Sequence, residues 1–394
     1  MQTRIRVVHI TTSHQPLDVR IFYKECRTLA AAGYEVHLVA PDPPAAKLDG
    51  VYFHAVPTPK DPQRFRRLGK RLTCTYAAYQ KAAALRARIY HFHDPDLIPA
   101  GILLKLRGAK VIYDVHEDYP EEALELNRDN PLWARVQSLG WAALEMMARL
   151  VIDRFVCATP AIARKFPPPK TVMVQNYPLL NELSLLQQAS QQSAYLDRRY
   201  SVIYSGLILA IRGICEMVRA LELLPERPGF EMLLLGEFSP PELRSDIERA
   251  PGWKRVDFRG WQPREKSLRS LLCARAGLVL FHPTFEHLES YPNKLFEYMA
   301  ASLPVIASNF PLWRSIVEDA GCGLLVDPQD PRAIAEAIDY LLTHPAEAEA
   351  MGARGQQAVR DRYNWDLESQ KLLALYRRIE ASSRQRLASQ RKRI

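Results

Sequence analysis

Short apolar segments rich in β-branched residues alternate along the chain with longer segments whose apolar residues recur at helical spacing. Residues 4–11 predict a first strand, an amphipathic helix ends near Gly33, and residues 35–40 predict a second strand. This alternation favours a parallel, doubly wound sheet. Ligands of such sheets bind at the carboxyl ends of the strands, so the loops that follow strands are the first places to look for a site.

The same alternation resumes after a polar, Gln- and Ser-rich stretch, and it divides the chain into two domains. We predict an N-terminal domain over 1–180, a linker over 181–200 and a C-terminal domain over 201–365. A helix is predicted over 366–380, followed by a basic, disordered tail over 381–394.

Composition is consistent with this division. The chain has 394 residues, of which 47% are hydrophobic and 25% charged, enough for two globular cores. It contains no apolar run of about 18 residues, and its first residues have too short an apolar segment for a signal peptide. The six cysteines are far apart without metal-ligand spacing. We therefore expect a reduced, cytoplasmic protein without structural zinc.

The net charge of +9 favours partners rich in phosphate, namely nucleotides, nucleic acid or anionic lipid headgroups. The segment 64–88 is predicted to be a helix dense in cations, with Arg64, Arg66, Arg67, Lys70, Arg71, Lys81, Arg86 and Arg88. Such a helix can bind peripherally to an anionic membrane surface, here the inner face of the membrane. The alternative is an ordinary solvated outer helix, because charged helix faces are common.

The stretch from 282 to 308 carries the strongest chemical pattern. It predicts a strand, a loop, a helix over 293–301 with Asn293 as its N-cap, and a further strand. A helix N-terminus is an anion site that suits nucleotide phosphates. Glu289 in the loop and Glu297 in the helix would repel phosphate but can accept hydrogen bonds from the vicinal diols of a sugar and a ribose. The alternative is that both carboxylates are merely solvated.

Two further loops hold polar candidates. Asp18 and Arg20 follow the first strand and are candidates for acceptor contact, although capping of the next helix is equally open. His116 follows the strand at 111–115, where a lone histidine is more often structural than functional. His91, His93 and His116 show no ligand spacing to a carboxylate triad, so no metal is expected.

Glu289 and Glu297 together match the E-x7-E pattern of the retaining glycosyltransferases of family 4, and the sequence AASLPVIAS that follows is similar to that family's AxGxPVVAS. The segment PNKLFEYMA resembles a subgroup that builds cell-surface polysaccharides. The resemblance implies the GT-B fold, two doubly wound Rossmann-like domains facing a central cleft, with the last helix returning to the first domain. It also implies that Glu289 contacts the donor sugar, that Glu297 contacts the ribose and that His116 reaches the donor sugar.

The family's loop Gly-Phe-Gly-Leu is replaced here by Ser290, Tyr291, Pro292 and Asn293, of which Ser290, Tyr291 and Asn293 are expected to contact the donor. The family's diphosphate pattern, a glycine and arginine followed by lysine and glycine, aligns with Gly206-Leu207 and Arg212-Gly213. Arg212 takes the place of the lysine, whereas Leu207 leaves the arginine position without a cation. Lys294 is expected to replace it, because without a metal some cation must neutralise the departing diphosphate.

The resemblance implies a metal-independent transfer, without a cofactor and with retention, of a sugar from a UDP- or GDP-linked donor to a polysaccharide, lipid-linked or other glycan acceptor. One alternative is a nucleotide-sugar 2-epimerase of the same fold, against which the E-x7-E pair speaks. Another is a non-catalytic nucleotide-sugar sensor, which Leu207 keeps open. A nucleic-acid binder would fit the charge, but the sequence has no reading helix or stacking aromatic motif.

Overall fold

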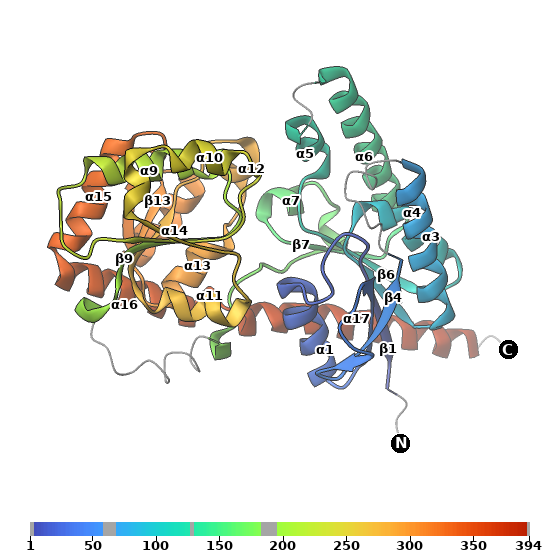
Figure 1. The fold of residues 1–394 in the computed structure, drawn as a ribbon. Coiled ribbons are helices and arrows are strands. Elements are labelled where there is room, and N and C mark those ends of the chain that lie inside the picture. Colours follow the sequence, from blue (N-terminus) through green and yellow to red (C-terminus); the bar gives the residue numbers. More distant parts are fainter. Residues whose placement is uncertain (1–3, 58–67, 127–129, 183–194, 392–394) are drawn as a thin grey trace. The chain divides into compact units, whose positions relative to one another are not determined.

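The computed structural model describes residues 4–57, 68–126, 130–182 and 195–391. The chain forms two compact units: in Figure 1 one is coloured from blue to green and includes the red last helix, and the other is coloured from green to dark orange. Unit 1 comprises Met1–Asn176 together with Leu367–Ile394, and unit 2 comprises Tyr177–Asp366. Each unit is an α/β domain built on a largely parallel sheet, as the alternation of elements predicts.

Unit 1 is built on an eight-stranded sheet of order β3-β4-β2-β1-β5-β6-β7-β8. Its strands are β1 (Arg6–Ile10), β2 (Glu35–Pro41), β3 (Lys47–Leu48), β4 (Val51–Val56), β5 (Ile89–Phe92), β6 (Lys110–Val115), β7 (Arg154–Cys157) and β8 (Thr171–Met173). All neighbours pair in parallel except β3, which is antiparallel to β4. The central strands are mostly apolar because helices cover both faces of a parallel sheet, and the buried His9, His91 and Asp114 interrupt them.

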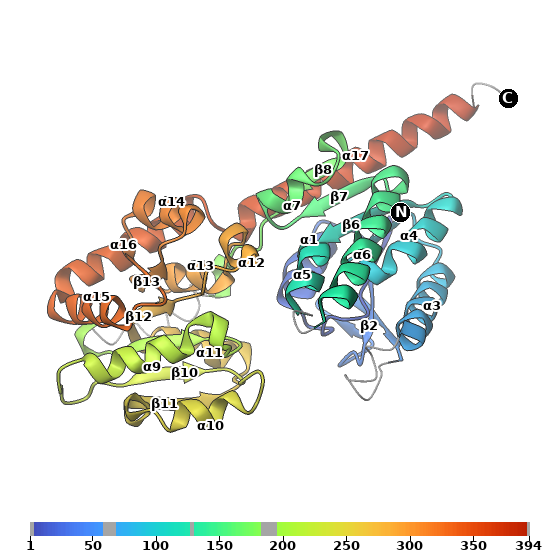
Figure 2. The ribbon, with the colours of Figure 1, turned by 90° about the horizontal axis from the view of Figure 1, so that it is seen from above.

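The helices of unit 1 include one π-helical segment, η1 (Val19–Cys26), which continues into α1 (Arg27–Ala31). The others are α3 (Leu68–Ala84), the 3-10 turn η2 (Pro95–Leu97), α4 (Ile98–Leu106), α5 (Tyr119–Leu126), α6 (Pro131–Val151), α7 (Pro160–Arg164), η3 (Pro168–Lys170) and α17 (Trp365–Arg391). Figure 2 shows α17 running along unit 1 as the last helix of the chain. Its Tyr376 and Leu372 are buried, which fixes the helix to this unit.

Unit 2 has a six-stranded parallel sheet of order β11-β10-β9-β12-β13-β14. Its strands are β9 (Tyr200–Ser205), β10 (Met232–Leu235), β11 (Val256–Gly260), β12 (Ala274–Val279), β13 (Val305–Ser308) and β14 (Gly323–Val326). Its helices are η4 (Tyr195–Asp197), η5 (Ala210–Arg212), α9 (Ile214–Leu223), α10 (Leu243–Glu248), η6 (Pro251–Arg255), α11 (Arg264–Leu271), α12 (Phe285–Glu289), α13 (Asn293–Ala300), α14 (Pro311–Ala320), α15 (Pro331–Thr343) and α16 (Pro345–Asp361). In both sheets the strand order reverses direction beside the first strand, which creates the switch point where ligands of such folds bind.

Two domain boundaries differ from the predicted ones. Most of the predicted linker, 183–194, lies outside the described residues, but Tyr195 is buried in the core of unit 2 rather than in a linker. The predicted tail is wrong for most of its length, because α17 continues to Arg391. Residues 366–391 contain neither glycine nor proline, so nothing in their sequence stops a helix.

The cation-dense helix is also shorter than predicted. α3 ends at Ala84, Arg86 adopts a positive φ of 49°, and the Arg88 N–H already donates to the Arg6 carbonyl oxygen at the start of β1. Arg64, Arg66 and Arg67 lie outside the described residues. Among the helices of the described residues, none has the length and apolar character needed to cross a bilayer.

Candidate functional site

The candidate site of unit 2 lies where β9 and β12, adjacent parallel strands, reach their carboxyl ends. The loop after β9 leads through Gly206 to η5 and Arg212. The loop after β12 leads through α12 to α13, which carries Lys294 in its first turn. The two loops that hold the sequence-predicted diphosphate residues are therefore brought together by the sheet.

Arg212 and Lys294 contact the same aromatic side chain. The Arg212 guanidinium carbon lies 5.2 Å from the ring centre of Phe281, and Lys294 Nζ lies 5.1 Å from it. Lys294 Nζ also lies 3.6 Å from the ring centre of Tyr204. Such cation–π contacts stabilise a cation modestly, but they do not replace a counter-ion.

Neither cation has the polar partner that burial requires. Within the described part of the chain, Lys294 Nζ and Arg212 Nε are buried nitrogens without a hydrogen-bond partner. Arg212 makes one long contact, 3.5 Å from Nη1 to the carbonyl oxygen of Leu207. Burial, and then the neighbouring Arg212, lower the pKa of Lys294 well below its usual value. Lys294 Nζ and Arg212 Nε thus lie near one another, each without a hydrogen-bond partner in the described residues.

Two glycines allow the loops to approach so closely. At Gly206 a Cβ atom would lie 3.0 Å from Lys294 Nζ. At Gly213, where φ is +76°, a Cβ atom would lie 2.0 Å from the carbonyl oxygen of Leu280. A side chain at either position would push into the space beside the two cations, and a positive φ is strained for any L-residue with a side chain.

The helix N-terminus beside Lys294 differs in detail from its prediction. Pro292 occupies the N-cap position without a side-chain cap, and Asn293 is the first helical residue, so Asn293 is not the cap. Proline is tolerated here because its missing N–H would have had no helical partner. The side chain of Asn293 is exposed and Ser290 accepts a hydrogen bond from Trp313 through its carbonyl oxygen, at 2.9 Å. Tyr291 packs against Phe296 in the core.

The two glutamates lie on separate short helices. Glu289 is the last residue of α12, which Thr284 caps by accepting from the N–H of His287, so the prediction that Glu289 lies in a loop is wrong. Glu297 lies in α13 as predicted, and its carboxylate is 3.4 Å from Arg264 Nη1. Both side chains are partly accessible at the same end of the sheet.

Arg264 is a site residue that the sequence reading missed. It begins α11 and makes a close pair with Glu182 at 2.7 Å, and it reaches Glu297 with its other terminal nitrogen. Glu182 and Arg264 are far apart in the sequence, and only the fold joins them. The start of a helix just after β11 was the only local signal, because loops after strands of this sheet lead to the site.

Unit 1 has its own polar cluster at the switch point between β1 and β5. Asp18 caps η1 by accepting from the N–H groups of Arg20 and Ile21, which confirms the capping alternative for this residue. The Arg20 side chain is 4% exposed and binds Asp114 with two nitrogens, at 2.9 and 2.7 Å. Arg20 therefore lies inside the unit and is not placed for contact with an acceptor, contrary to the prediction.

His116 lies at the rim of this cluster. Its Nε2 is 2.7 Å from Asp114 Oδ2, and its side chain is partly exposed while Asp114 is fully buried. His93 Nδ1 lies 3.1 Å from the same oxygen, Asp114 Oδ2. Burial works against ionisation of Asp114, but Arg20 and His116 outweigh it and hold the pKa of this carboxyl well below its usual range. A buried carboxylate that orients a histidine gives His116 a fixed position at the end of β6.

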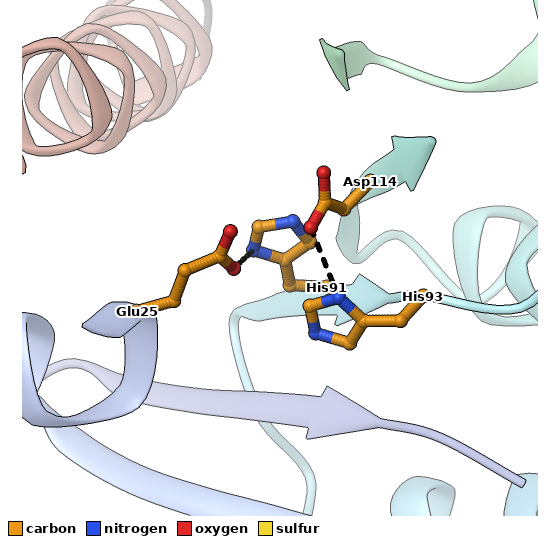
Figure 3. Close-up of side chains that lie close together, drawn as sticks. All are labelled: Glu25, His91, His93 and Asp114. Atoms are coloured by element: carbon orange, nitrogen blue, oxygen red, sulfur yellow. Dashed lines mark hydrogen bonds and ion pairs between the residues drawn. The ribbon is translucent and has the colours of Figure 1, made fainter. Parts of the chain in front are cut away.

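The interior of the cluster holds four side chains that could share a cation. Figure 3 shows Glu25 beside His91 and His93 beside Asp114, and each residue offers one ligand atom within 4.8 Å of the others. Both oxygens of Glu25 are buried without a hydrogen-bond partner in the described residues, although Arg20 Nε lies 3.4 Å away. The separations along the sequence do not reveal this arrangement.

Only part of the cluster is paired. Arg20 already occupies both oxygens of Asp114, so a divalent ion would have to compete with the guanidinium for that ligand. Burial, followed by repulsion from Asp114, raises the pKa of Glu25 well above its usual value. Burial likewise lowers the pKa of His9, His91 and His93, which favours neutral rings. The cluster is therefore one ion pair, Arg20 with Asp114, beside a buried carboxyl group that has no hydrogen-bond partner in the described residues.

Two family models match the chain. The model for Glycosyltransferase Family 4 matches residues 19–167, in unit 1. The model for Glycosyl transferases group 1 matches residues 187–358, in unit 2. The two matches lie one in each unit, and between them they leave only the ends of the chain and a short connection unmatched.

Curated relatives match over part of their length. The D-inositol 3-phosphate glycosyltransferase of Acidothermus cellulolyticus is 31% identical over 203 residues, 48% of this chain and 44% of that protein. The phosphatidyl-myo-inositol mannosyltransferase of Mycobacterium leprae is 35% identical over 94 residues, 24% of this chain and 25% of that protein. The chain thus aligns with less than half the length of each of these two relatives.

Solved structures share the fold at low identity. The sucrose-phosphate synthase of Thermosynechococcus elongatus superposes with a TM-score of 0.75 at 18% identity, over 96% of this chain and 100% of that chain. The Anabaena protein HepE in complex with UDP-glucose gives a TM-score of 0.68 at 14% identity, over 96% of this chain and 100% of that chain. Such likeness establishes the GT-B type of architecture.

Proposed function

Because the chain belongs to the glycosyltransferases of family 4, we propose that it moves a sugar from a UDP- or GDP-linked donor to a glycan or lipid-linked acceptor, with retention at the anomeric carbon and without a metal. Unit 2 would hold the donor. The relatives named for inositol phosphate and phosphatidylinositol acceptors support an acceptor with hydroxyl groups next to phosphate, but they do not select one.

One observation carries the donor site. The buried Lys294 and the half-buried Arg212 lie at the switch point of unit 2, and each has a buried nitrogen without a partner in the described residues. Holding them together is costly unless an anion enters. A nucleotide diphosphate supplies that anion in the place where such sheets bind nucleotides. The lowered pKa of Lys294 supports the same interpretation, because a bound diphosphate would raise that pKa again.

The proposed chemistry follows from these groups. The bond between the anomeric carbon and the diphosphate oxygen breaks, and the negative charge that develops on that oxygen is stabilised by Arg212, Lys294 and the N-terminus of α13. The acceptor hydroxyl attacks from the same face and gives its proton to the departing phosphate oxygen. Glu289 would hold the hydroxyls of the donor sugar, Glu297 those of the ribose, and His116 would reach the donor sugar.

Incubation with nucleotide-sugars tests the proposal. The purified chain is mixed with UDP- and GDP-linked hexoses, with and without a lipid extract as the source of acceptor, in the presence of EDTA. We expect nucleotide diphosphate and a glycosylated product that form only when acceptor is present. Isomerised sugar released without acceptor would identify an epimerase instead, and tight binding without turnover would identify a sensor. Loss of turnover in EDTA with rescue by Mg²⁺ would contradict metal independence.

A further inference from the structure

Helix α6 of unit 1 turns its large apolar side chains outward. Side chains that are between 51% and 78% exposed follow one another at helical spacing along Pro131–Val151: Leu132, Val136, Leu139, Met146, Met147 and Leu150, joined by Trp133. A helix of a globular domain normally turns such residues toward the core. An exposed apolar face of this length marks an interaction site.

The inward side of the same helix buries fewer large apolar side chains. Its buried residues are Ala134, Glu145 and Ala148, while the half-buried Leu144 packs against the core and the half-buried Trp141 against Tyr119. Glu145, the one acidic residue of the helix, is buried and lies 3.5 Å from Arg149. The outward face of α6 therefore carries no acidic residue and exposes more large apolar side chains than the inward side covers.

Cations stand at both ends of the apolar face. Arg135 is exposed in the second turn, between Trp133 and Val136. At the other end the Lys170 ammonium donates to the last carbonyl oxygens of α6, at 2.9 Å to Arg149 and 3.3 Å to Leu150. The neighbouring helix α4, which packs against α6, adds the exposed side chains of Leu103 and Leu106 (Figure 1, Figure 2).

We propose that this outward face of α6 lies in the surface of an anionic lipid bilayer. Three features fit that partner: an apolar face without acidic residues, a tryptophan on it, and cations at its ends. Helices that lie in the plane of a membrane surface have this composition, with tryptophan at the level of the headgroups. The cations would meet anionic headgroups, each contributing to attraction.

A second copy of the chain fits the face less well. A two-fold contact sets the same surface of both copies against itself. The outward face of α6 has cations but no acidic residue, so in such a contact Arg135 would have to find a partner outside the face. An anionic bilayer supplies that partner everywhere along the helix. The inference goes beyond the donor chemistry and is tested without nucleotide.

Sedimentation with vesicles tests it, using phosphatidylcholine alone and phosphatidylcholine mixed with phosphatidylglycerol. The wild-type chain is expected to pellet with the anionic vesicles and to be released as salt rises. The double variant Leu139→Gln/Leu150→Gln should partition about 100-fold more weakly, because two leucines no longer enter the lipid. Arg135→Gln should weaken binding to the anionic vesicles about fivefold, the expected share of one cation.

The matched control replaces two leucines of unit 2 that are also exposed, Leu196→Gln/Leu223→Gln. It should partition like the wild type. Glutamine is a good helix former, and thermal unfolding checks that both double variants stay folded. Equal pelleting of the two double variants would overturn the proposal, as would a wild type that stays in the supernatant. A dimer in sedimentation velocity that Leu139→Gln/Leu150→Gln dissolves, without vesicle binding, would instead assign the face to a second copy.

Discussion

In both units charged side chains lie at the switch point of the sheet, but the two units differ in whether the protein itself pairs these side chains. Between β1 and β5 of unit 1, Arg20 is buried and both of its contacts to Asp114 are short. Between β9 and β12 of unit 2, Lys294 is buried and the neighbouring Arg212 half-buried, and each has a buried nitrogen without a partner in the described residues. At the switch point of unit 1 the cation is paired within the protein, whereas at that of unit 2 nitrogens of both cations lack a partner in the described residues.

The difference separates a scaffold from a binding site. A buried charge is tolerated when the protein pairs it, and the pair then stabilises the fold only as long as both partners are present. A buried charge left without a partner costs stability until a ligand supplies one. Removing a cation should therefore have opposite consequences in the two units, which makes the comparison open to experiment.

The largest effect is expected for Arg20→Met. It leaves Asp114 buried without its counter-ion, and it should lower the free energy of unfolding by about 3–5 kcal/mol, the range for breaking one side of a buried pair. Denaturant unfolding measures it, with the exposed Arg360→Met of α16 as control. The double variant Arg20→Met/Asp114→Leu should lose less than the sum of the two single losses. Strict additivity would mean that the two side chains do not interact.

Lys294→Met should have the opposite effect on stability from Arg20→Met. The thioether can keep the contact with the Tyr204 and Phe281 rings, while a buried nitrogen without a hydrogen-bond partner in the described residues disappears. The free energy of unfolding should stay the same or rise, whereas kcat should fall by roughly 10²-fold, the scale for loss of one stabilising donor. Activity and unfolding are measured on the same preparation. A loss of stability as large as that of Arg20→Met would mean that Lys294 has a structural partner after all.

This contrast also shows which parts of the molecule the sequence could predict. Strands, the two-domain order and the pair Arg212 and Lys294 rest on local patterns and on loops after strands, and the structure brings these two cations together. The Arg20–Asp114 pair joins residues 94 positions apart, so only the folded sheet reveals it. Arg264 and Glu182 are joined in the same way, at a separation of 82.

Some errors could have been avoided from the residues alone. Thr284, three residues before His287, is a capping signal for α12, and it places Glu289 on a helix rather than in a loop. The lack of glycine and proline after residue 366 allows α17 to continue to Arg391. The outward face of α6 could not be found this way, because periodicity shows that a helix has an apolar stripe but not which side of it faces the protein.

Variants of the two glutamates of unit 2 test whether different residues bind the ribose and the sugar of the donor. Glu297→Ala should weaken binding of free nucleotide diphosphate roughly tenfold, because the ribose contact exists with or without a sugar. Arg264 remains paired with Glu182, so this variant should stay folded. Glu289→Ala should leave the affinity for free nucleotide diphosphate unchanged and lower kcat. Titration calorimetry and turnover measure the two effects, and equal loss of nucleotide affinity in both variants would refute these assignments.

Binding of the nucleotide diphosphate should also be coupled to uptake of a proton by the protein. In the free protein the pKa of Lys294 is lowered by burial and by Arg212, and a bound diphosphate raises it again. The complex then holds more protons than the free protein, so the affinity falls as pH rises, by up to about tenfold per pH unit. Above about pH 7.5 the phosphate is already fully ionised and does not contribute. Calorimetry in buffers of different ionisation enthalpy should show proton uptake in the wild type and little in Lys294→Met.

The smallest effect belongs to Glu25 in the closed cluster of unit 1. Burial and Asp114 raise the pKa of this carboxyl above its usual value, so the native state keeps a proton that the unfolded state releases above about pH 4.5. That contribution to stability is complete at low pH and is lost as pH rises, by at most about 1.4 kcal/mol per pH unit. Glu25→Gln cannot ionise, so it should match the wild type at low pH and become the more stable protein as pH rises.

His9, His91 and His93 act in the opposite sense in both proteins, because their lowered pKa values favour the native state as pH rises. Their contributions cancel in the difference between the two proteins. Unfolding of the two proteins across the pH range therefore isolates the proton on Glu25. A constant difference would mean that the cluster holds its balance with some other cation, and metal analysis of the purified wild type would then be the next measurement.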